Sequence, residues 1–176
     1  MTATTTSAKP ASTDRIEKLV DLDAPRSRVW RALTDVAQFN AWFGVNLESP
    51  FSPGAAVSGR ITFKGYDHLT LTIWIEAMEP ERFFSFRWHP YAVELDVDYS
   101  TEPTTLVSFT LEDLAEGRTR LTIVESGFDA IPESRRAKAF AMNTGGWNGQ
   151  AENIRKHLAA SASDEGHVAP YEPSAE

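Results

Sequence analysis

Hydrophobic and polar residues alternate with a period of two through the middle of the chain. The alternation spans residues 57–64, 69–76, 84–88, 105–111 and 119–123, with glycine- or proline-containing turns between the segments. Apolar residues at positions 16, 20 and 22 indicate one more strand near the N-terminus. Side chains of a strand point alternately to its two faces, so this pattern is typical of a sheet with one buried face. The sequence therefore predicts six antiparallel strands.

Helical spacing replaces the alternation after the first strand. Proline fits the first turn of a helix, and apolar residues four and three positions apart follow Pro25, so a helix is predicted over residues 25–36. The aromatic residues within 39–43 predict a second short helix, and Gly44 is a suitable residue to end it.

A longer helical pattern occupies the C-terminal part of the chain. Pro132 suits the first turn, and residues of one stripe then recur every three or four positions, which predicts a helix of up to 28 residues. The stripe consists of Phe140, Asn143, Trp147, Ala151, Ile154 and Leu158. Gly145 and Gly146 weaken this helix by about 1 kcal/mol each. We expect them either to kink the helix or to let its backbone pack closely against the sheet.

Both ends of the chain are polar and rich in small residues. Residues 1–13 and 161–176 contain too few apolar side chains to offset the entropy of ordering, so we expect disordered tails around one domain at 14–160. No apolar run is long enough to span a membrane, and residues 1–13 lack the apolar core of a secretion signal. These features favour a cytoplasmic protein without membrane insertion.

The amino-acid composition excludes several kinds of functional site and argues against one class of partner. The chain has no cysteine, which excludes disulfides, a thiolate nucleophile and a cysteine-ligated zinc site. It carries 17 Lys and Arg against 25 Asp and Glu, a net charge of −8. An acidic chain without a basic patch argues against nucleic acid as a partner.

Four stretches, spread over about residues 15–160, resemble a known superfamily. They are Asp23-Ala24-Pro25 with Val29-Trp30-Arg31-Ala32-Leu33-Thr34-Asp35, Phe39 with Trp42-Phe43, Thr119-Arg120-Leu121-Thr122 with Glu125-Ser126-Gly127-Phe128, and Gly146-Trp147 with Ile154 and Leu158. Together they are similar to the START-like (SRPBCC) superfamily. Within it, the chain resembles the branch related to the C-terminal domain of the Hsp90 ATPase activator Aha1.

This resemblance implies an α+β fold of the helix-grip type. Its curved, antiparallel six-stranded sheet would wrap around the long C-terminal helix, with two short helices after the first strand. The superfamily includes lipid carriers, hormone receptors, cyclases and chaperone regulators, so the resemblance alone does not fix an activity. Two features depart from the branch: residues 1–13 cannot supply the separate N-terminal domain of the eukaryotic activator, and the segment from Phe86 to Glu102 is longer than in compact members.

Catalytic and metal motifs are absent from the sequence. It contains no HExxH, GxSxG, GxGxxG or P-loop motif. Glu94, Asp96 and Asp98 alternate and could hold a hard cation, but charged residues on a solvated edge are the more common reason for such a pattern. We therefore predict neither a metal nor a cofactor.

Glu125 is the acidic residue with the most interesting position. If Leu121 and Ile123 face the helix, alternation places Glu125 inward as well, where its pKa would be raised and it could bind or protonate a ligand. Its place at the strand end favours the other interpretation, in which it is solvated or paired with an arginine.

The aromatic residues suggest a binding function. They could fill a solid core or line a cavity between sheet and helix, and the bend of a helix-grip sheet favours the cavity. The predicted lining is Phe63, Ile73, Phe84, Phe86, Trp88, Phe109, Ile123, Glu125, Asn143 and Trp147. Residues His89, Tyr91 and Tyr99 of the long loop could reach its mouth.

We therefore expect non-catalytic binding of an apolar or aromatic small molecule, such as a lipid, a polyketide-like compound or a phenol. One alternative is a chaperone (Hsp90)-related or stress-response adaptor, which the resemblance implies. For that adaptor, or for a homodimer, Trp74 is the predicted contact because it falls on the solvent face unless a bulge turns it inward. Another alternative is a cyclase or hydrolase that uses Glu125 with a loop Tyr or His as acid and base.

Overall fold

A seven-stranded antiparallel sheet organises residues 13–165, the part of the chain that the computed structural model describes. The strand order is β1-β7-β6-β5-β4-β3-β2. The strands are β1 (Arg15–Leu22), β2 (Val45–Leu47), β3 (Ala56–Ile61), β4 (Thr70–Glu79), β5 (Phe83–Trp88), β6 (Thr105–Leu114) and β7 (Arg118–Ser126). The helices are α1 (Arg26–Thr34), α2 (Val36–Phe43) and α3 (Glu133–Glu165), with 3₁₀ turns at Ala115–Gly117 and Phe128–Ala130.

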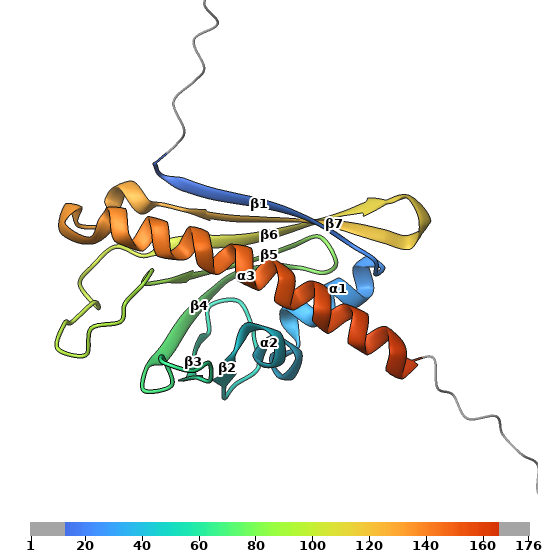
Figure 1. Cartoon of the computed structure of the whole chain (residues 1–176), viewed down its shortest axis with the longest axis horizontal. Coiled ribbons are helices and arrows are strands. Elements are labelled where there is room, and N and C mark those ends of the chain that lie inside the picture. The colour runs from blue at the N-terminus through green and yellow to red at the C-terminus, as the bar shows by residue number, and fades with distance from the viewer. Residues whose placement is uncertain (1–12, 166–176) are drawn as a thin grey trace, which may run out of the picture.

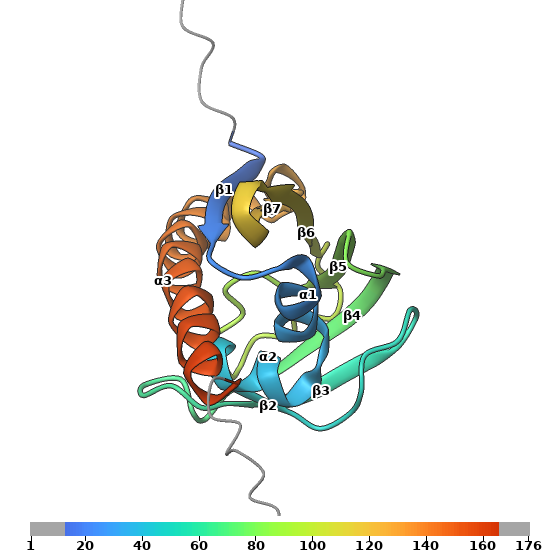
Figure 2. The ribbon, with the colours of Figure 1, turned by 90° about the vertical axis from the view of Figure 1, so that its right-hand side faces the viewer.

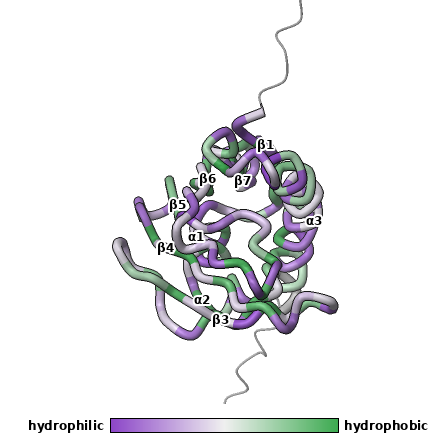
Figure 3. The backbone as a smooth tube through the Cα atoms, turned by 90° about the vertical axis from the view of Figure 1, so that its left-hand side faces the viewer, coloured by the Kyte–Doolittle hydropathy of each residue, from purple (hydrophilic) through white to green (hydrophobic). Residues whose placement is uncertain are grey.

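The long helix α3 runs across the inner face of this curved sheet (Figure 1). Figure 2 shows the sheet curving from β1 round to β2, with α1 inside the curve and α3 along its open side. Hydrophobic and hydrophilic positions are interleaved along the chain, as the colours in Figure 3 show. This arrangement confirms the helix-grip fold.

The sheet has one strand more than the sequence pattern predicts. Gly44, with φ of 86°, ends α2 in a left-handed conformation, and β2 (Val45–Leu47) starts directly after it. This strand pairs with β3, where Gly59 lies opposite Leu47. A Cβ atom at Gly59 would come within 2.0 Å of the Asn46 carbonyl oxygen, so the close approach requires glycine. Three residues are too few for an alternation to be recognised in the sequence.

Helix α3 continues through Gly145 and Gly146 as one helix. A Cβ atom at either glycine would meet no atom within 4 Å. The expectation of close packing against the sheet is therefore wrong at both positions. The helix also includes residues 161–165, which the sequence assigns to the tail. Residues 1–12 and 166–176, the remainder of the predicted tails save Thr13, lie outside the described residues.

Aromatic rings of neighbouring strands form the solid part of the core. Phe84 and Phe86 of β5 and Phe109 of β6 are fully buried. The Phe84 and Phe109 rings stack with centroids 5.8 Å apart, and those of Phe86 and Phe109 lie 6.0 Å apart. Burial of one such side chain contributes about 1.5–3 kcal/mol. This part of the molecule holds the sheet in position against α3.

Candidate functional site

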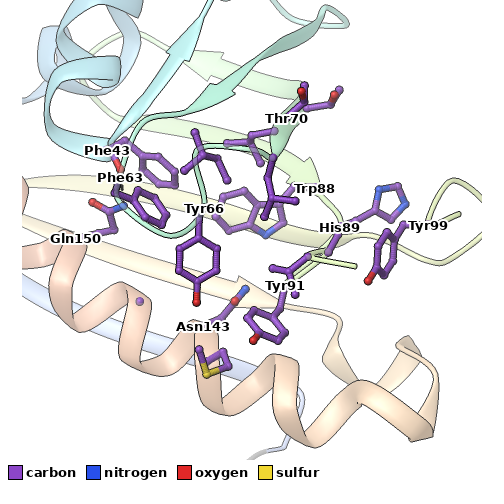
Figure 4. A pocket seen from close by; sticks show the side chains of 18 of the residues that line it. Phe43, Phe63, Tyr66, Thr70, Trp88, His89, Tyr91, Tyr99, Asn143 and Gln150 are labelled. Carbon is purple, nitrogen blue, oxygen red and sulfur yellow. Dashed lines mark hydrogen bonds between the residues drawn. The ribbon is translucent and has the colours of Figure 1, made fainter. Parts of the chain in front are cut away.

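A cavity of about 650 Å³ lies between the β3–β4 side of the sheet and α3. Three segments enclose it together with the strands: the β3–β4 loop (residues 62–69), the β5–β6 loop (residues 89–104) and the middle of α3. Figure 4 shows side chains from all three converging on the same space. The site therefore depends on segments that are distant in sequence.

Aromatic side chains dominate the wall. Those that contribute are Phe43, Phe63, Tyr66, Trp74, Trp88, Tyr91, Tyr99 and Trp147. Trp88 of β5 stacks on Trp147 of α3 with ring centroids 5.8 Å apart, and Phe43 lies 5.9 Å from Trp88. Such a wall favours an apolar or aromatic occupant, because contact with it removes apolar surface from water.

The wall residues Trp88, Asn143 and Trp147 are anchored from behind by Glu125. This side chain is fully buried, and Trp88 Nε1 and Trp147 Nε1 donate to its Oε1 and Oε2, each over 2.7 Å. The Thr105 hydroxyl donates to Oε1 over 2.7 Å. Asn143 Nδ2 lies 3.0 Å from Oε1 and 3.1 Å from Oε2. One carboxylate thus connects β5, β6, β7 and α3.

Burial raises the pKa of Glu125, while its four hydrogen-bonding partners oppose the rise. The interpretation of Glu125 as a solvated or arginine-paired residue at the strand end is therefore wrong. Alternation does place it inward, but it lies behind the wall and not in it. Because both oxygens accept hydrogen bonds and neither is exposed, the carboxylate is poorly placed to exchange a proton with a molecule in the cavity.

The β5–β6 loop is fastened to the start of α3 by Arg135. Its Nε donates to Glu102 Oε2 over 2.8 Å, and its Nη1 donates to the Pro90 carbonyl over 2.7 Å. The guanidinium carbon also lies 4.9 Å from the centre of the Tyr99 ring. The Arg135 and Glu102 side chains are only 19% and 16% exposed. The loop therefore has a specific attachment beside the cavity.

The structure divides the predicted lining residues into two groups. Phe63, Trp88, Asn143 and Trp147 line the cavity, together with His89, Tyr91 and Tyr99 of the loop. The other predicted residues lie in the core beside the cavity and do not line it, because they pack against neighbouring strands or, for Glu125, behind the indoles. They are Ile73, Phe84, Phe86, Phe109, Ile123 and Glu125.

Of two further aromatic residues, Phe63 differs from its expected position and Trp74 does not. Phe63 lies beyond the end of β3, in the loop, where it is 43% exposed and its ring packs on Gly44 and Tyr66. Trp74 keeps its outward position on β4, since the irregular register occurs after it, between Ile75 and Ala77. Its ring meets His89 edge to face at 5.5 Å and contributes to the cavity wall.

Sequence reasoning missed several lining residues. Phe43 and Tyr66 line the cavity, as do Gly145 and Gly146, which add no side chain to the α3 side of it. The two adjacent glycines within an otherwise regular helical stripe were the signal that could have indicated a hollow.

Neither a metal-binding cluster nor a membrane-spanning helix is found within residues 13–165. Residues 13–165 contain no group of three His, Asp or Glu side chains arranged to hold a metal ion. Glu94, Asp96 and Asp98 lie in the β5–β6 loop and are exposed. None of the helices in this range combines the length and the apolar character needed to cross a bilayer.

Comparisons with known proteins agree with this fold. The family described as "Activator of Hsp90 ATPase homolog 1-like protein" matches residues 23–159. No curated protein matches the chain. Among solved structures, DynU16, a protein from the dynemicin biosynthetic locus, is 27% identical with a TM-score of 0.65 over 84% of this chain. The match covers 48% of DynU16, so this chain spans about half of its length.

Two further structures resemble nearly the whole described fold. A protein from Rhodobacter sphaeroides is 25% identical, with a TM-score of 0.63 over 86% of this chain and 96% of that one. The Aha1 dimer from Colwellia psychrerythraea is 16% identical, with a TM-score of 0.60 over 82% of this chain and 95% of that one. At this lower identity the likeness concerns the fold alone.

Proposed function

The chain belongs to the family of Activator of Hsp90 ATPase homolog 1-like proteins, and from this premise we propose that it binds an apolar or aromatic small molecule. The binding site is the cavity between the sheet and α3. The function is binding without catalysis, and Phe63, Trp88, Asn143 and Trp147 contact the ligand from the wall.

The size and lining of the cavity carry this proposal. A volume of about 650 Å³ falls inside the range of roughly 300–1,000 Å³ that is usual for ligand pockets. Affinity would come mainly from burial of apolar surface, at about 25 cal/mol per Å² before the costs of ordering. The wall provides aromatic surface from both the sheet and α3, so a flat or elongated apolar molecule could be covered on two sides.

The 27% identical relative gives independent support. Its locus serves the biosynthesis of dynemicin, which is a small-molecule context. Because only part of that protein is matched, its own ligand or activity is not transferred to this chain.

Titration with candidate ligands, followed by tryptophan fluorescence and by the melting temperature, tests the proposal. Three of the five tryptophans, Trp74, Trp88 and Trp147, line the cavity, so an apolar ligand should quench tryptophan emission saturably and raise the melting temperature. A first panel would contain naphthalene derivatives, flavonoids, fatty acids and aromatic polyketides.

Two glycine variants of α3 provide a matched comparison. Gly146→Phe places a ring in the cavity, whereas Gly149→Phe places one only in a neighbouring hollow along α3. Neither Cβ would collide with other atoms. We expect Gly146→Phe to abolish the quenching and Gly149→Phe to retain it. Absence of any response across the panel, or equal binding by both variants, would refute the proposal.

A chaperone-related role is the second candidate, and family membership is the observation in its favour. It predicts that the tagged full chain retains Hsp90 on affinity resin in the presence of ATP. Failure to retain it would count against this role. Trp74, the surface residue considered for such a contact, belongs to the cavity wall. Homodimer formation and a cytoplasmic location stay predictions.

The enzymatic alternative receives little support from the geometry. It needs Glu125 to reach a substrate, yet this side chain is fully buried behind Trp88, Asn143 and Trp147. Within the proposal, Glu125 positions the wall and does not react.

A further inference from the structure

Asn143 joins the buried Glu125 to the cavity. Its side chain rises from α3 toward Trp88 in Figure 4 and forms part of the cavity lining. Its amide nitrogen lies 3.0 Å and 3.1 Å from the two carboxylate oxygens of Glu125. The amide therefore bridges a buried charge and an open space.

The partners of Glu125 fix which way this amide points. A carboxylate only accepts hydrogen bonds, and the indole groups of Trp88 and Trp147 only donate them. The amide nitrogen must therefore face Glu125, since the amide oxygen there would meet two acceptor oxygens. Among residues 13–165 no hydrogen-bond donor reaches Asn143 Oδ1. This leaves an acceptor of fixed orientation on a residue of the cavity wall.

Two other polar residues of the wall, Gln150 and His89, are engaged elsewhere. The Gln150 amide nitrogen donates to the Phe43 carbonyl over 2.8 Å, and its oxygen accepts from Asn153 over 3.1 Å. His89 Nε2 lies 3.2 Å from the Glu102 carbonyl. The hydroxyls of Tyr66 and Tyr91 can rotate and act as donor or acceptor. Asn143 is thus the wall group whose geometry distinguishes a ligand donor from a ligand acceptor.

We infer that the ligand is a neutral apolar molecule that donates one hydroxyl or N–H hydrogen bond to Asn143 Oδ1. This inference rests on the proposed function and specifies its ligand. The carboxylate behind Asn143 polarises the amide, which strengthens its oxygen as an acceptor. The same negative charge disfavours a ligand carboxylate at this position. Phenols, enols and indoles fit these requirements.

A set of probes of nearly equal shape tests the inference on the unmodified protein. 2-Naphthol carries a donor, 2-methylnaphthalene replaces the hydroxyl by a methyl group, and 2-methoxynaphthalene retains only an acceptor. Dissociation constants would be measured by tryptophan quenching and calorimetry. We expect 2-naphthol to bind about tenfold more tightly than 2-methoxynaphthalene, which corresponds to one hydrogen bond of about 1.4 kcal/mol.

Substitutions test whether Asn143 causes the preference for 2-naphthol over 2-methoxynaphthalene. Asn143→Leu should reduce the ratio of the 2-methoxynaphthalene to the 2-naphthol dissociation constant about tenfold, and Asn143→Ala provides the same test if the first variant folds poorly. Asn148→Leu, the same replacement at an exposed position of the same helix outside the cavity lining, should leave the ratio unchanged. Glu125→Gln should lower the ratio as well, because a glutamine side chain no longer fixes the amide.

The outcomes separate the inference from the proposed function. If all three probes bind with similar constants, or if Asn143→Leu keeps the ratio, the donor inference is wrong while the binding function stands. If no naphthalene probe and no other apolar compound binds, the proposed function itself fails.

Discussion

Two halves of the space between the sheet and α3 contain aromatic rings, yet one is solid and the other is hollow. In the solid half, Phe84, Phe86 and Phe109 are fully buried and stack on one another across paired strands. In the hollow half, Phe63 and Tyr66 come from a loop and contact each other at the edge of the cavity. The number of aromatic residues therefore does not decide whether a hollow forms.

The two halves differ in what packs against their rings. In the solid half, Phe86 meets Phe39 of α2 and Phe109 meets Trp147 of α3, with ring centroids 6.3 Å and 6.0 Å apart. At Gly145 and Gly146, in contrast, a Cβ atom would meet nothing within 4 Å. Two glycines in mid-helix cost about 1 kcal/mol each relative to alanine. Packing does not explain that cost, because no neighbour approaches them. The comparison indicates that the two glycines leave space open along the α3 side of the hollow half.

Trp147 lies between the two halves, and its replacement is expected to have the largest effect on the free energy of unfolding. It is 2% exposed, stacks on Trp88 and donates to Glu125 over 2.7 Å. We expect Trp147→Ala to lower the free energy of unfolding by about 3–5 kcal/mol, as for other buried aromatic residues. Urea denaturation followed by circular dichroism measures this change.

Trp74 is the control for that measurement, because it lines the cavity from the other side but is 37% exposed. Trp74→Ala should cost about 1 kcal/mol or less, the range of surface substitutions with little packing. Similar losses for the two tryptophans would mean that the border drawn between the solid and hollow halves is misplaced.

The Glu125→Gln variant tests whether the buried Glu125 carboxylate stabilises the boundary between the solid and hollow halves. In Glu125→Gln, an amide NH₂ replaces one carboxylate oxygen and faces indole or amide donors. The loss of these hydrogen bonds should lower the free energy of unfolding by about 1–3 kcal/mol. The comparison must be made against the unmodified chain at each pH, so that other titrating groups cancel.

The pH dependence of this difference has a defined sign. Burial raises the pKa of Glu125 above its ordinary value, so between the two values the folded state binds more protons than the unfolded state. The free energy of unfolding of the unmodified chain should then decrease, relative to Glu125→Gln, as the pH rises through this window. A difference that is constant across the window, or that grows with pH, would contradict a raised pKa.

The contrast between the halves also explains what sequence reasoning could recover. Period-two alternation identifies the strands that carry Phe84, Phe86 and Phe109, and helical spacing identifies the stripe with Trp147. The position of Phe63 depends on where a strand stops: β3 ends at Ile61, so Phe63 belongs to a loop and does not follow the alternation. The sequence pattern contains no signal for that end.

The contacts between neighbouring strands and α3 could not be predicted from the sequence either. Trp88, Thr105, Asn143 and Trp147 meet at Glu125 because the registers of β5, β6 and β7 and the placement of α3 bring them together. Alternation indicates that Glu125 points inward, but only the register shows which donors surround it. Without the register, the sequence could not show whether Glu125 is solvated or is buried with hydrogen-bond donors around it.

Arg135 offers a way to loosen the hollow half without touching the solid half. Arg135→Gln removes the ion pair with Glu102 and the hydrogen bond to the Pro90 carbonyl. Water can replace part of these interactions, so we expect a loss of about 1 kcal/mol. Amide hydrogen exchange should become faster in residues 89–104 and stay unchanged in β6 and β7.

The neighbouring residue Arg136, which donates to the Ile131 carbonyl, is the matched control for this exchange experiment. Arg136→Gln should leave exchange in the β5–β6 loop as it is. If Arg135→Gln accelerates exchange throughout the sheet, the two halves are coupled more strongly than their packing suggests.

Replacement of a glycine in α3 is expected to have the smallest effect on the free energy of unfolding. Gly146→Ala adds a methyl group to open space, so it should raise the free energy of unfolding by about 0.5–1 kcal/mol through helix propensity alone. Gly59→Ala should act in the opposite direction, because its methyl group would collide with the Asn46 carbonyl. Thermal and urea denaturation of both variants measure the contrast. A destabilised Gly146→Ala would mean that this glycine serves the fold. A stabilised one would mean that Gly146 costs the helix stability, as the open space beside it predicts.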